Sequence, residues 1–297
     1  MVLKIDEFDK IKELYDVSIM ELSKEDNESL FKYLDEPTQW QSNRKRRTFY
    51  ASDATRCERQ LFYSVSGEKE TNPSIGPKQL KIFALGDAIH EGISDRYRQV
   101  DGWKFYEEAP GEIHIPKRDE HETDFLLHYR VDGILKRKFG EEKLLGLDTD
   151  CMITEFKSSA DFPYSTGKNK KGEIYWFGAK DVPKYDHFAQ LQLGMYGESV
   201  KYGVLHYYNK NNSEESVHVL ELNKPFVENL IERMWLVMDR IARGELPERP
   251  YKAYPNKKKT ALQKSKVIDG VTHKSDWHCQ YCNFSDMCWG LNGFEVE

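Results

Sequence analysis

Val131-Asp132-Gly133 and Glu155-Phe156-Lys157 each belong to an extended stretch of alternating character, residues 125–135 and 151–157 respectively. Side chains alternate between the two faces of a strand, so Glu155 and Lys157 project to the same side. If the two strands pair, Asp132 reaches that side as well. Two carboxylates beside an ammonium group offer the oxygen ligands that Mg2+ prefers. The alternative is a solvent-exposed strand face on which Glu155 forms a salt bridge with Lys157.

The segments around these two strands predict alternating helices and strands. A short helix over 52–66 is expected to use Ser52 or Asp53 as its N-cap. A helix over 79–99 is expected to bury an apolar face formed by Leu80, Phe83, Ala84, Ala88 and Ile89. The other expected elements are a strand over 103–115, a helix over 185–199, a hairpin of 201–209 and 216–222, and a helix opened by Pro225 and stopped at Gly244. This order predicts an α/β core with a mixed sheet and excludes an all-α or all-β fold.

Polar side chains on two of these helices are further candidates for the site. A lone helix histidine is usually structural, but His90 follows small residues that permit close backbone approach, so it is also a candidate metal ligand. On the helix over 185–199, a neutral amide or phenol could bind a phosphate or hold Lys157 and a water. The candidates there are Gln190, Gln192 and Tyr196.

Four of the five cysteines form two groups that are far apart in the sequence. Cys57 stands alone, whereas Cys279, Cys282 and Cys288 form a C-x2-C-x5-C run after a basic, proline-containing tail that is expected to be a loop. Without an export signal the thiols should stay reduced, so this grouping indicates a metal centre, either an iron–sulfur cluster or zinc. The two ends of the chain are then expected to meet around that centre. Cys151 is interpreted as a buried strand residue.

The charge of the chain is unevenly distributed. The net charge is −6 over 297 residues, but residues 1–36 alone contain five lysines and eleven acidic residues, and the rest is balanced. Basic clusters in that rest, such as Arg44-Lys45-Arg46-Arg47 and Lys257-Lys258-Lys259, could contact phosphates or be solvated loops. No apolar run approaches the roughly 20 residues that span a bilayer. A cytoplasmic protein, of a prokaryotic cell or a phage-infected host, is expected.

The order of these motifs resembles that of a known family. His90, Asp132, Glu155-Phe156-Lys157 and Gln192-x3-Tyr196 follow one another as do the motifs of RecB-like nucleases of the PD-(D/E)xK superfamily. With the four cysteines added, the chain resembles the CRISPR-associated iron–sulfur exonucleases and the AddB-type nuclease domains, and a phage-type exonuclease fits as well. The likeness covers about residues 50–290. Val131 replaces the proline that usually precedes the motif aspartate.

This resemblance implies a restriction-endonuclease-like core with an iron–sulfur subdomain that joins the N- and C-terminal parts. It implies a [4Fe–4S] cluster on Cys57, Cys279, Cys282 and Cys288, with zinc as the alternative occupant. A Mg2+ or Mn2+ site would use His90, Asp132, Glu155 and the Phe156 carbonyl, with Lys157 as the catalytic lysine. Either Gln192 or Gln190 would carry the motif glutamine. The implied activity is a DNA exonuclease that acts on single strands or frayed ends and leaves 5'-phosphate and 3'-hydroxyl groups, in recombination, repair or foreign-DNA processing.

The same reading divides the chain into residues 1–49, an acidic helical appendage with a basic linker, and a nuclease domain over 50–297 with a cluster-binding tail over 245–297. The basic insertion over 161–184 could cover a bound strand or be a surface loop; its candidate DNA contacts are Lys168, Lys170, Lys171, Lys180 and Trp176. The aromatic residues near the cysteine run either shield the sulfurs or stack on bases: Trp277, Tyr281, Phe284 and Trp289. The competing interpretation is a non-catalytic scaffold that binds DNA ends or a helicase or recombination partner, with 1–36 as its docking surface.

Overall fold

The computed structural model describes residues 48–70, 77–118, 124–138, 146–159, 167–168, 174–175 and 183–294. Residues 43–74 and 82–297 belong to one compact unit, and residues 1–42 and 75–81 to another. The elements discussed below lie in the first unit, except for the first turn of one helix. The predicted N-terminal appendage falls almost wholly outside the described residues. None of the helices in the described ranges combines the length and apolar character needed to cross a membrane.

The core is a mixed six-stranded sheet, as the sequence predicted. Its strands are β1 (Phe49–Tyr50), β2 (Trp103–Ile115), β3 (Phe125–Arg137), β4 (Cys151–Ser159), β7 (Tyr202–Asn209) and β8 (Glu215–Glu221). The order is β1-β3-β4-β7-β8, and β2 also pairs with β3. The pairs β1–β3 and β4–β7 are parallel, and the others are antiparallel.

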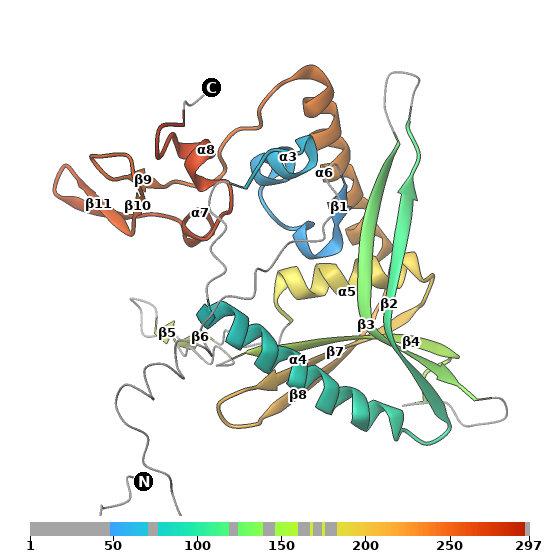
Figure 1. The fold of residues 1–297 in the computed structure, drawn as a ribbon. Coiled ribbons are helices and arrows are strands. Elements are labelled where there is room, and N and C mark those ends of the chain that lie inside the picture. Colours follow the sequence, from blue (N-terminus) through green and yellow to red (C-terminus); the bar gives the residue numbers. More distant parts are fainter. Residues whose placement is uncertain are drawn as a thin grey trace, which may run out of the picture. The chain divides into compact units, whose positions relative to one another are not determined.

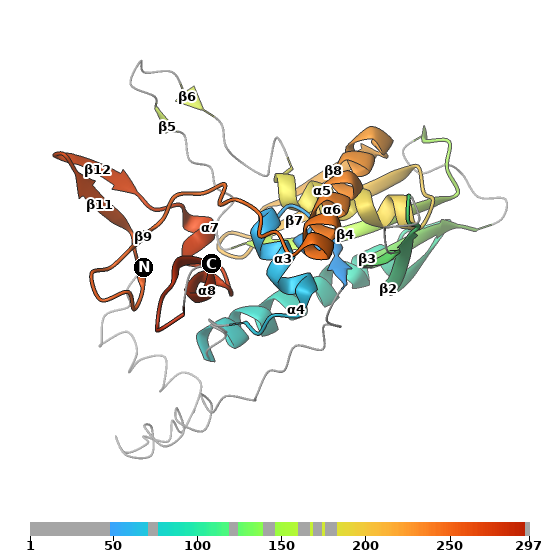
Figure 2. The ribbon, with the colours of Figure 1, turned by 90° about the horizontal axis from the view of Figure 1, so that it is seen from above.

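Helices flank this sheet on both faces (Figure 1). On one face lies α5 (Tyr185–Gly197), in contact with α6 (Lys224–Arg243), which packs in turn on α3 (Glu58–Ser66). The helix α5 approaches closely because Gly194 has no side chain: a Cβ there would lie 2.6 Å from Val131 and 3.0 Å from Ile153. On the other face lies α4 (Pro77–Arg98), which Figure 2 shows from above. There the Tyr97 ring of α4 lies 5.2 Å from the Phe156 ring of β4.

The strands β3 and β4 separate partway along their length. Their ladder runs from Lys136 opposite Cys151 to Gly133 opposite Thr154 and stops there. Beyond that point β3 continues its pairing with β2, whereas β4 continues with β7 as far as Ser159. The two strands therefore form a fork that opens immediately beside Asp132 and Glu155, and Figure 1 shows β3 rising away from β4.

Two sequence-based expectations about helix ends have different outcomes. The helix α6 begins and ends as predicted: Asn223 caps it by accepting from Phe226 N–H at 3.1 Å, and Gly244 closes it with a φ of 67°. The prediction of Ser52 or Asp53 as the N-cap of α3 is wrong. Residues Ala51–Asp53 form a separate 3-10 turn, and the cap of α3 is Cys57, whose sulfur accepts from Gln60 N–H at 3.4 Å.

The predicted apolar face of α4 is not buried as expected. Phe83 is 48% exposed, and Ala84 and Ala88 are exposed as well, because the close packing of this helix is made further along, by Ile93 and Tyr97. The helix α4 is therefore held to the sheet chiefly through its C-terminal half.

The tail also contains more regular structure than the predicted loop. It forms the small hairpins β9–β10 (Tyr254–Pro255, Leu262–Gln263) and β11–β12 (Ser265–Ile268, Val271–Lys274), followed by α7 (Trp277–Gln280) and α8 (Ser285–Trp289). In the insertion, β5 (Gly167–Lys168) pairs with β6 (Ile174–Tyr175).

Candidate active site

Asp132 lies at the fork between β3 and β4. Its Oδ2 accepts a hydrogen bond from the Phe156 N–H at 2.6 Å, just past the last backbone pair of the ladder. The carboxylate thus replaces the backbone acceptor that the next residue pair of the ladder would have supplied, and it spans the gap where the strands separate. It is held toward β4 by an atom of the main chain, which fixes its position relative to Glu155.

Glu155 is almost completely buried, at 1% exposure, and only one of its two carboxylate oxygens has a hydrogen-bond partner among the described residues. Its Oε1 accepts from Lys157 Nζ at 2.5 Å, whereas Oε2 has no hydrogen-bond partner among the described residues. Burial, and secondly the charge of Asp132, raise the pKa of Glu155 to about 8. A buried carboxylate oxygen without a partner is costly, so this atom indicates that the site is built to receive a positive group.

Lys157 connects Glu155 to helix α5. Burial opposes its charge, but Glu155 and Asp132 together raise its pKa, so it remains an ammonium group. Its Nζ also donates to Gln190 Oε1 at 3.2 Å. A neutral acceptor from the helix therefore fixes the lysine without cancelling its charge.

His90 reaches the same region from the opposite face of the sheet. Its ring lies edge-on to Phe156, with 6.0 Å between centroids, and burial lowers its pKa although the charge of Asp132 opposes this. One turn earlier, a Cβ on Gly86 would lie 3.6 Å from Ser158 Oγ, so α4 runs close to the end of β4. A neutral imidazole beside Asp132 is compatible with the predicted role of His90 as a metal ligand.

A polar network fixes the position of α4 next to His90. Tyr97 on α4 hydrogen bonds His206 Nδ1 at 3.2 Å, and His206 Nε2 contacts Glu215 at 2.9 Å. Arg96, also on α4, donates from one nitrogen, Nη1, to both carboxylate oxygens of Glu215, at 2.8 and 3.0 Å. These bonds join α4 to β7 and β8, so the height of His90 above the sheet is determined by residues two turns away.

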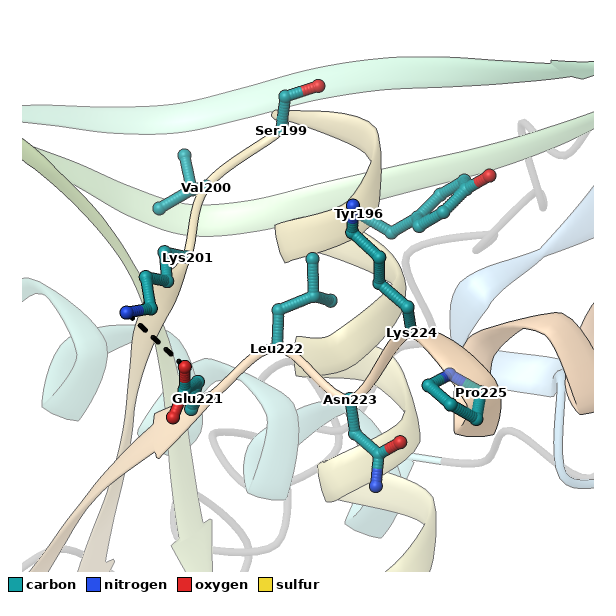
Figure 3. A pocket seen from close by; sticks show the side chains of 9 residues that line it. All are labelled: Tyr196, Ser199, Val200, Lys201, Glu221, Leu222, Asn223, Lys224 and Pro225. Atoms are coloured by element: carbon teal, nitrogen blue, oxygen red, sulfur yellow. Dashed lines mark ion pairs between the residues drawn. The ribbon is translucent and has the colours of Figure 1, made fainter.

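Gln192 and Tyr196 do not join this group. Gln192 is fully buried and binds the connection between β8 and α6: its Oε1 accepts from Asn223 N–H at 2.6 Å and its Nε2 donates to the Glu221 carbonyl at 3.1 Å. Tyr196 lines a hollow of about 1080 Å³ near the C-terminal end of α5, where Lys201 pairs with Glu221 at 3.4 Å (Figure 3). Of the two candidate glutamines, Gln190 is therefore the one in contact with Lys157.

His187 belongs to this neighbourhood and was missed in the sequence. It lies one turn before Gln190 on α5, its Nδ1 is 3.0 Å from the Tyr207 hydroxyl, and the charge of Lys157 acts on it. Burial comes first among the causes that lower its pKa to about 4. Its i, i+3 relation to Gln190 was the available signal, because such residues share one helix face.

The structure brings the four grouped cysteines into one neighbourhood. Burial, and then the thiols of Cys288, Cys57 and Cys282, raise the pKa of Cys279 to about 12. Burial and two of the same thiols raise that of Cys282 to about 11. All five cysteines are free, and Cys151 lies apart on β4. Cys57 therefore lies near the C-terminal run, and the metal centre expected between them stays a prediction.

The loop between these cysteines is closed by contacts that involve no metal. Arg59 on α3 donates to the Pro247 carbonyl at 3.1 Å, and the Tyr63 and Phe284 rings are 5.6 Å apart. Arg249 donates to the Cys288 carbonyl at 2.6 Å. The protein itself therefore holds the tail against α3.

Neither predicted metal site has its ligands assembled at bonding positions. In the parts of the chain that the structure describes, no three or more His, Cys, Asp or Glu side chains are arranged so that they could hold a metal ion as they stand. The assignment of metals must therefore come from what the residues offer chemically. The predicted contacts Lys170, Lys171, Lys180 and Trp176 fall outside the described residues, and only the backbone of Lys168, in β5, is described.

Comparison with known proteins gives only loose likenesses. No family model and no curated protein matches the chain. Among solved structures, SSO0001 is 18% identical, over 91% of this chain and 97% of that one, with a TM-score of 0.46. An alkaline exonuclease from Laribacter hongkongensis, LHK-Exo, is 13% identical, over 67% and 89%, with a TM-score of 0.42; its complex with dAMP gives 0.37 over the same shares. Likenesses of this size assign no activity.

Proposed function

We propose that this chain is a divalent-metal-dependent nuclease that hydrolyses phosphodiester bonds at the fork between β3 and β4. The observation that carries the proposal is a second carboxylate, Asp132, whose charge acts on Glu155, together with the buried Glu155 Oε2, which has no hydrogen-bond partner among the described residues. A structural salt bridge between Glu155 and Lys157 would not require a second carboxylate beside it. Together with Gln190 and His90, these residues form a site with both the oxygen ligands and the fixed ammonium group that phosphodiester hydrolysis needs.

The residues divide into two roles in this proposal. Asp132, Glu155 and His90 would hold Mg2+ or Mn2+, with the Phe156 carbonyl as a further oxygen ligand. The bound ion would polarise a phosphate oxygen and lower the pKa of a water. Lys157 would donate to the attacking water or to a phosphate oxygen, and Gln190 holds it in that direction at 3.2 Å. Because the ammonium group is fixed before substrate arrives, little reorganisation is needed at the moment of reaction.

We further propose that the substrate is DNA, cut as an exonuclease from single strands or frayed ends to leave 5'-phosphate and 3'-hydroxyl products. The reaction would serve recombination, repair or the processing of foreign DNA. Support for this finer assignment comes from the order of the sequence motifs. The exonuclease likenesses are too distant to add to it.

The four cysteines are proposed to hold a [4Fe–4S] cluster, with zinc as the alternative. Their chemistry fits a cationic centre: burial, and then the neighbouring thiols, raise the pKa values of Cys279 and Cys282, and a metal would supply the missing positive charge. Anaerobically purified protein should then be brown with a broad visible absorbance band. A colourless preparation with stoichiometric zinc would overturn the iron–sulfur assignment.

The test of the activity uses end-labelled single-stranded DNA with Mg2+ or Mn2+. Wild type should degrade it, and Glu155→Gln, which keeps the shape but removes the charge, should not. The position of the label gives the polarity of cleavage. Binding without cleavage by wild-type protein with its metals loaded would instead favour the scaffold interpretation.

A further inference from the structure

The aromatic residues next to the cysteine run divide into two groups. Phe284 is buried at 3% exposure against Tyr63, and Trp289 hydrogen bonds Cys279 while its ring receives the Arg249 guanidinium at 4.7 Å. Their positions fit the sequence-based alternative in which aromatic residues shield the sulfurs. Trp277 and Tyr281, in contrast, are 62% and 76% exposed, so shielding does not explain them.

Trp277 ends a stack of rings that is already formed. Tyr251 and His278 lie face to face, with 4.6 Å between centroids and 4° between planes, and His278 in turn stacks on Trp277 at 3.8 Å. His278 is fixed from the side by Asp276, which accepts its N–H at 2.6 Å. The indole is therefore held rigidly although most of its surface faces solvent. A preorganised ring of this kind can receive a flat partner without losing side-chain freedom.

Tyr281 extends this surface. It lies four residues after Trp277, and its N–H donates to the Trp277 carbonyl at 3.3 Å, so the two side chains project from neighbouring positions. Tyr281 is the most exposed of the large apolar side chains in the described ranges. Val267 and Val271 on the β11–β12 hairpin are exposed as well, at 65% and 57%. This part of the tail therefore leaves several large apolar side chains exposed to solvent.

The charge of residues 251–281, which include Trp277 and Tyr281, indicates what kind of molecule would bind there. Residues 251–281 contain seven lysines and two aspartates, and no arginine or glutamate. The lysines are exposed, and none makes an ion pair with the residues that the structure describes: Lys252, Lys257, Lys258, Lys259, Lys264, Lys266 and Lys274. Exposed rings among unpaired lysines match a strand that offers base faces and phosphates together. An acidic protein would use the lysines but would leave a rigid, exposed indole without a purpose.

We infer that Trp277 and Tyr281, with the lysines around them, form a platform on which unpaired bases of a single nucleic acid strand stack. This inference rests on the proposed function and deepens it, because it assigns the single-strand preference to a surface built on the metal-binding tail rather than to the fork. In this inference Phe284 and Trp289 pack inside the tail, whereas Trp277 and Tyr281 face solvent and contact the bases. Duplex DNA, whose bases are already stacked, would engage only the lysines.

The test is a binding measurement without divalent metal, so that cleavage plays no part. The probes are fluorescein-labelled (dT)20 and an abasic deoxyribose-phosphate strand of the same length, compared by anisotropy. Wild type should bind (dT)20 roughly tenfold or more tightly than the abasic strand. The double variant Trp277→Ala/Tyr281→Ala should lose most of this difference, whereas Tyr106→Ala, which removes an exposed ring on β2, should keep it.

The lysines give an independent readout. Replacing Lys264, Lys266 and Lys274 by alanine should weaken both probes equally and reduce the salt dependence of binding by about 2 in log–log slope. Equal affinity of wild type for both probes, or no effect of the double variant, would overturn the platform and leave a protein-docking surface in its place. Wild type that prefers (dT)20 but never cleaves it would overturn the proposed nuclease activity and leave the platform standing.

Discussion

The Asp132 carboxylate accepts a hydrogen bond from the Phe156 N–H at the point where β3 and β4 stop pairing. One side chain thereby closes the end of a strand ladder and presents a charge to the buried Glu155. The free energy of this arrangement is unfavourable without a cation, because the Asp132 charge is one of the causes that raise the pKa of Glu155. Function and stability are therefore opposed at this position.

Asp132→Asn separates these two effects. The amide oxygen can still accept from Phe156 N–H, so the fold should be kept, while a metal-binding charge is lost. We expect DNA cleavage to fall roughly 100-fold or more. Urea unfolding in EDTA should show a stability equal to or above that of wild type, because the repulsion of Glu155 is relieved. Asp132→Ala, which also removes the acceptor, should be less stable than Asp132→Asn by about 1 kcal/mol. Retained cleavage in Asp132→Asn would remove this residue from the site.

Replacing each of the two glutamines of α5 should affect a different property, the cleavage rate for Gln190 and the stability for Gln192. Gln190→Ala should lower the single-turnover cleavage rate roughly 10- to 100-fold, because Lys157 loses the acceptor that directs it, and should leave stability nearly unchanged. Gln192→Ala should lower the free energy of unfolding by about 2 to 4 kcal/mol, because the Asn223 N–H and the Glu221 carbonyl lose their partner in a buried place. The reverse assignment of effects would restore Gln192 as the motif glutamine.

This difference between the glutamines shows that the sequence predicts where a helix lies along the chain but not which of its residues face the site. Strand and helix positions follow from local periodicity and caps, which is why β2, β3, β4 and α6 were predicted well. The rotation of α5 about its axis is decided by tertiary packing, with Gly194 against Val131 and Ile153. Spacing alone left Gln190 and Gln192 as alternatives, although Gln192, two positions along, lies on another side of the helix.

The other misses have the same origin. The cap of α3 is a cysteine thiol, and cysteine is not among the preferred N-cap residues. The N-cap preferences of Ser and Asp therefore led to the wrong prediction of Ser52 or Asp53. The exposed face of α4 looks like a core face in the sequence because periodicity reports amphipathic character and not the partner that covers it. The fork has no signal of its own, since β3 and β4 each continue as regular strands past the point where they separate.

His187 should make the stability of the metal-free protein depend on pH in mildly acidic solution. An unfolded histidine has a pKa near 6.5, whereas burial and then nearby charges leave that of His187 at about 4 in the folded protein. Between these values the unfolded chain binds a proton that the folded chain does not, so the free energy of unfolding falls as the pH decreases. The loss should reach on the order of 2 to 3 kcal/mol by pH 4.

His187→Asn provides the comparison for this prediction. It places a polar atom near the position of Nδ1, next to the Tyr207 hydroxyl, but does not titrate. Urea unfolding in EDTA from pH 7 to pH 4 should give a flatter profile for the variant than for wild type. If the two profiles run parallel, protonation of His187 is not the cause of the acid sensitivity.

Cys57 and Cys151 offer a matched pair for testing the metal centre. Both are partly buried free thiols, but Cys57 caps α3 beside the C-terminal cysteines, whereas Cys151 begins β4. We expect Cys57→Ser to lose most of the bound iron or zinc and to unfold at a lower temperature, because the tail then depends on contacts such as Arg59 with Pro247. Serine still caps a helix, so the loss cannot come from the cap. Cys151→Ser should keep its metal content and its absorbance. Metal loss in both variants would show a general effect of thiol removal, and metal retained in Cys57→Ser would exclude Cys57 as a ligand.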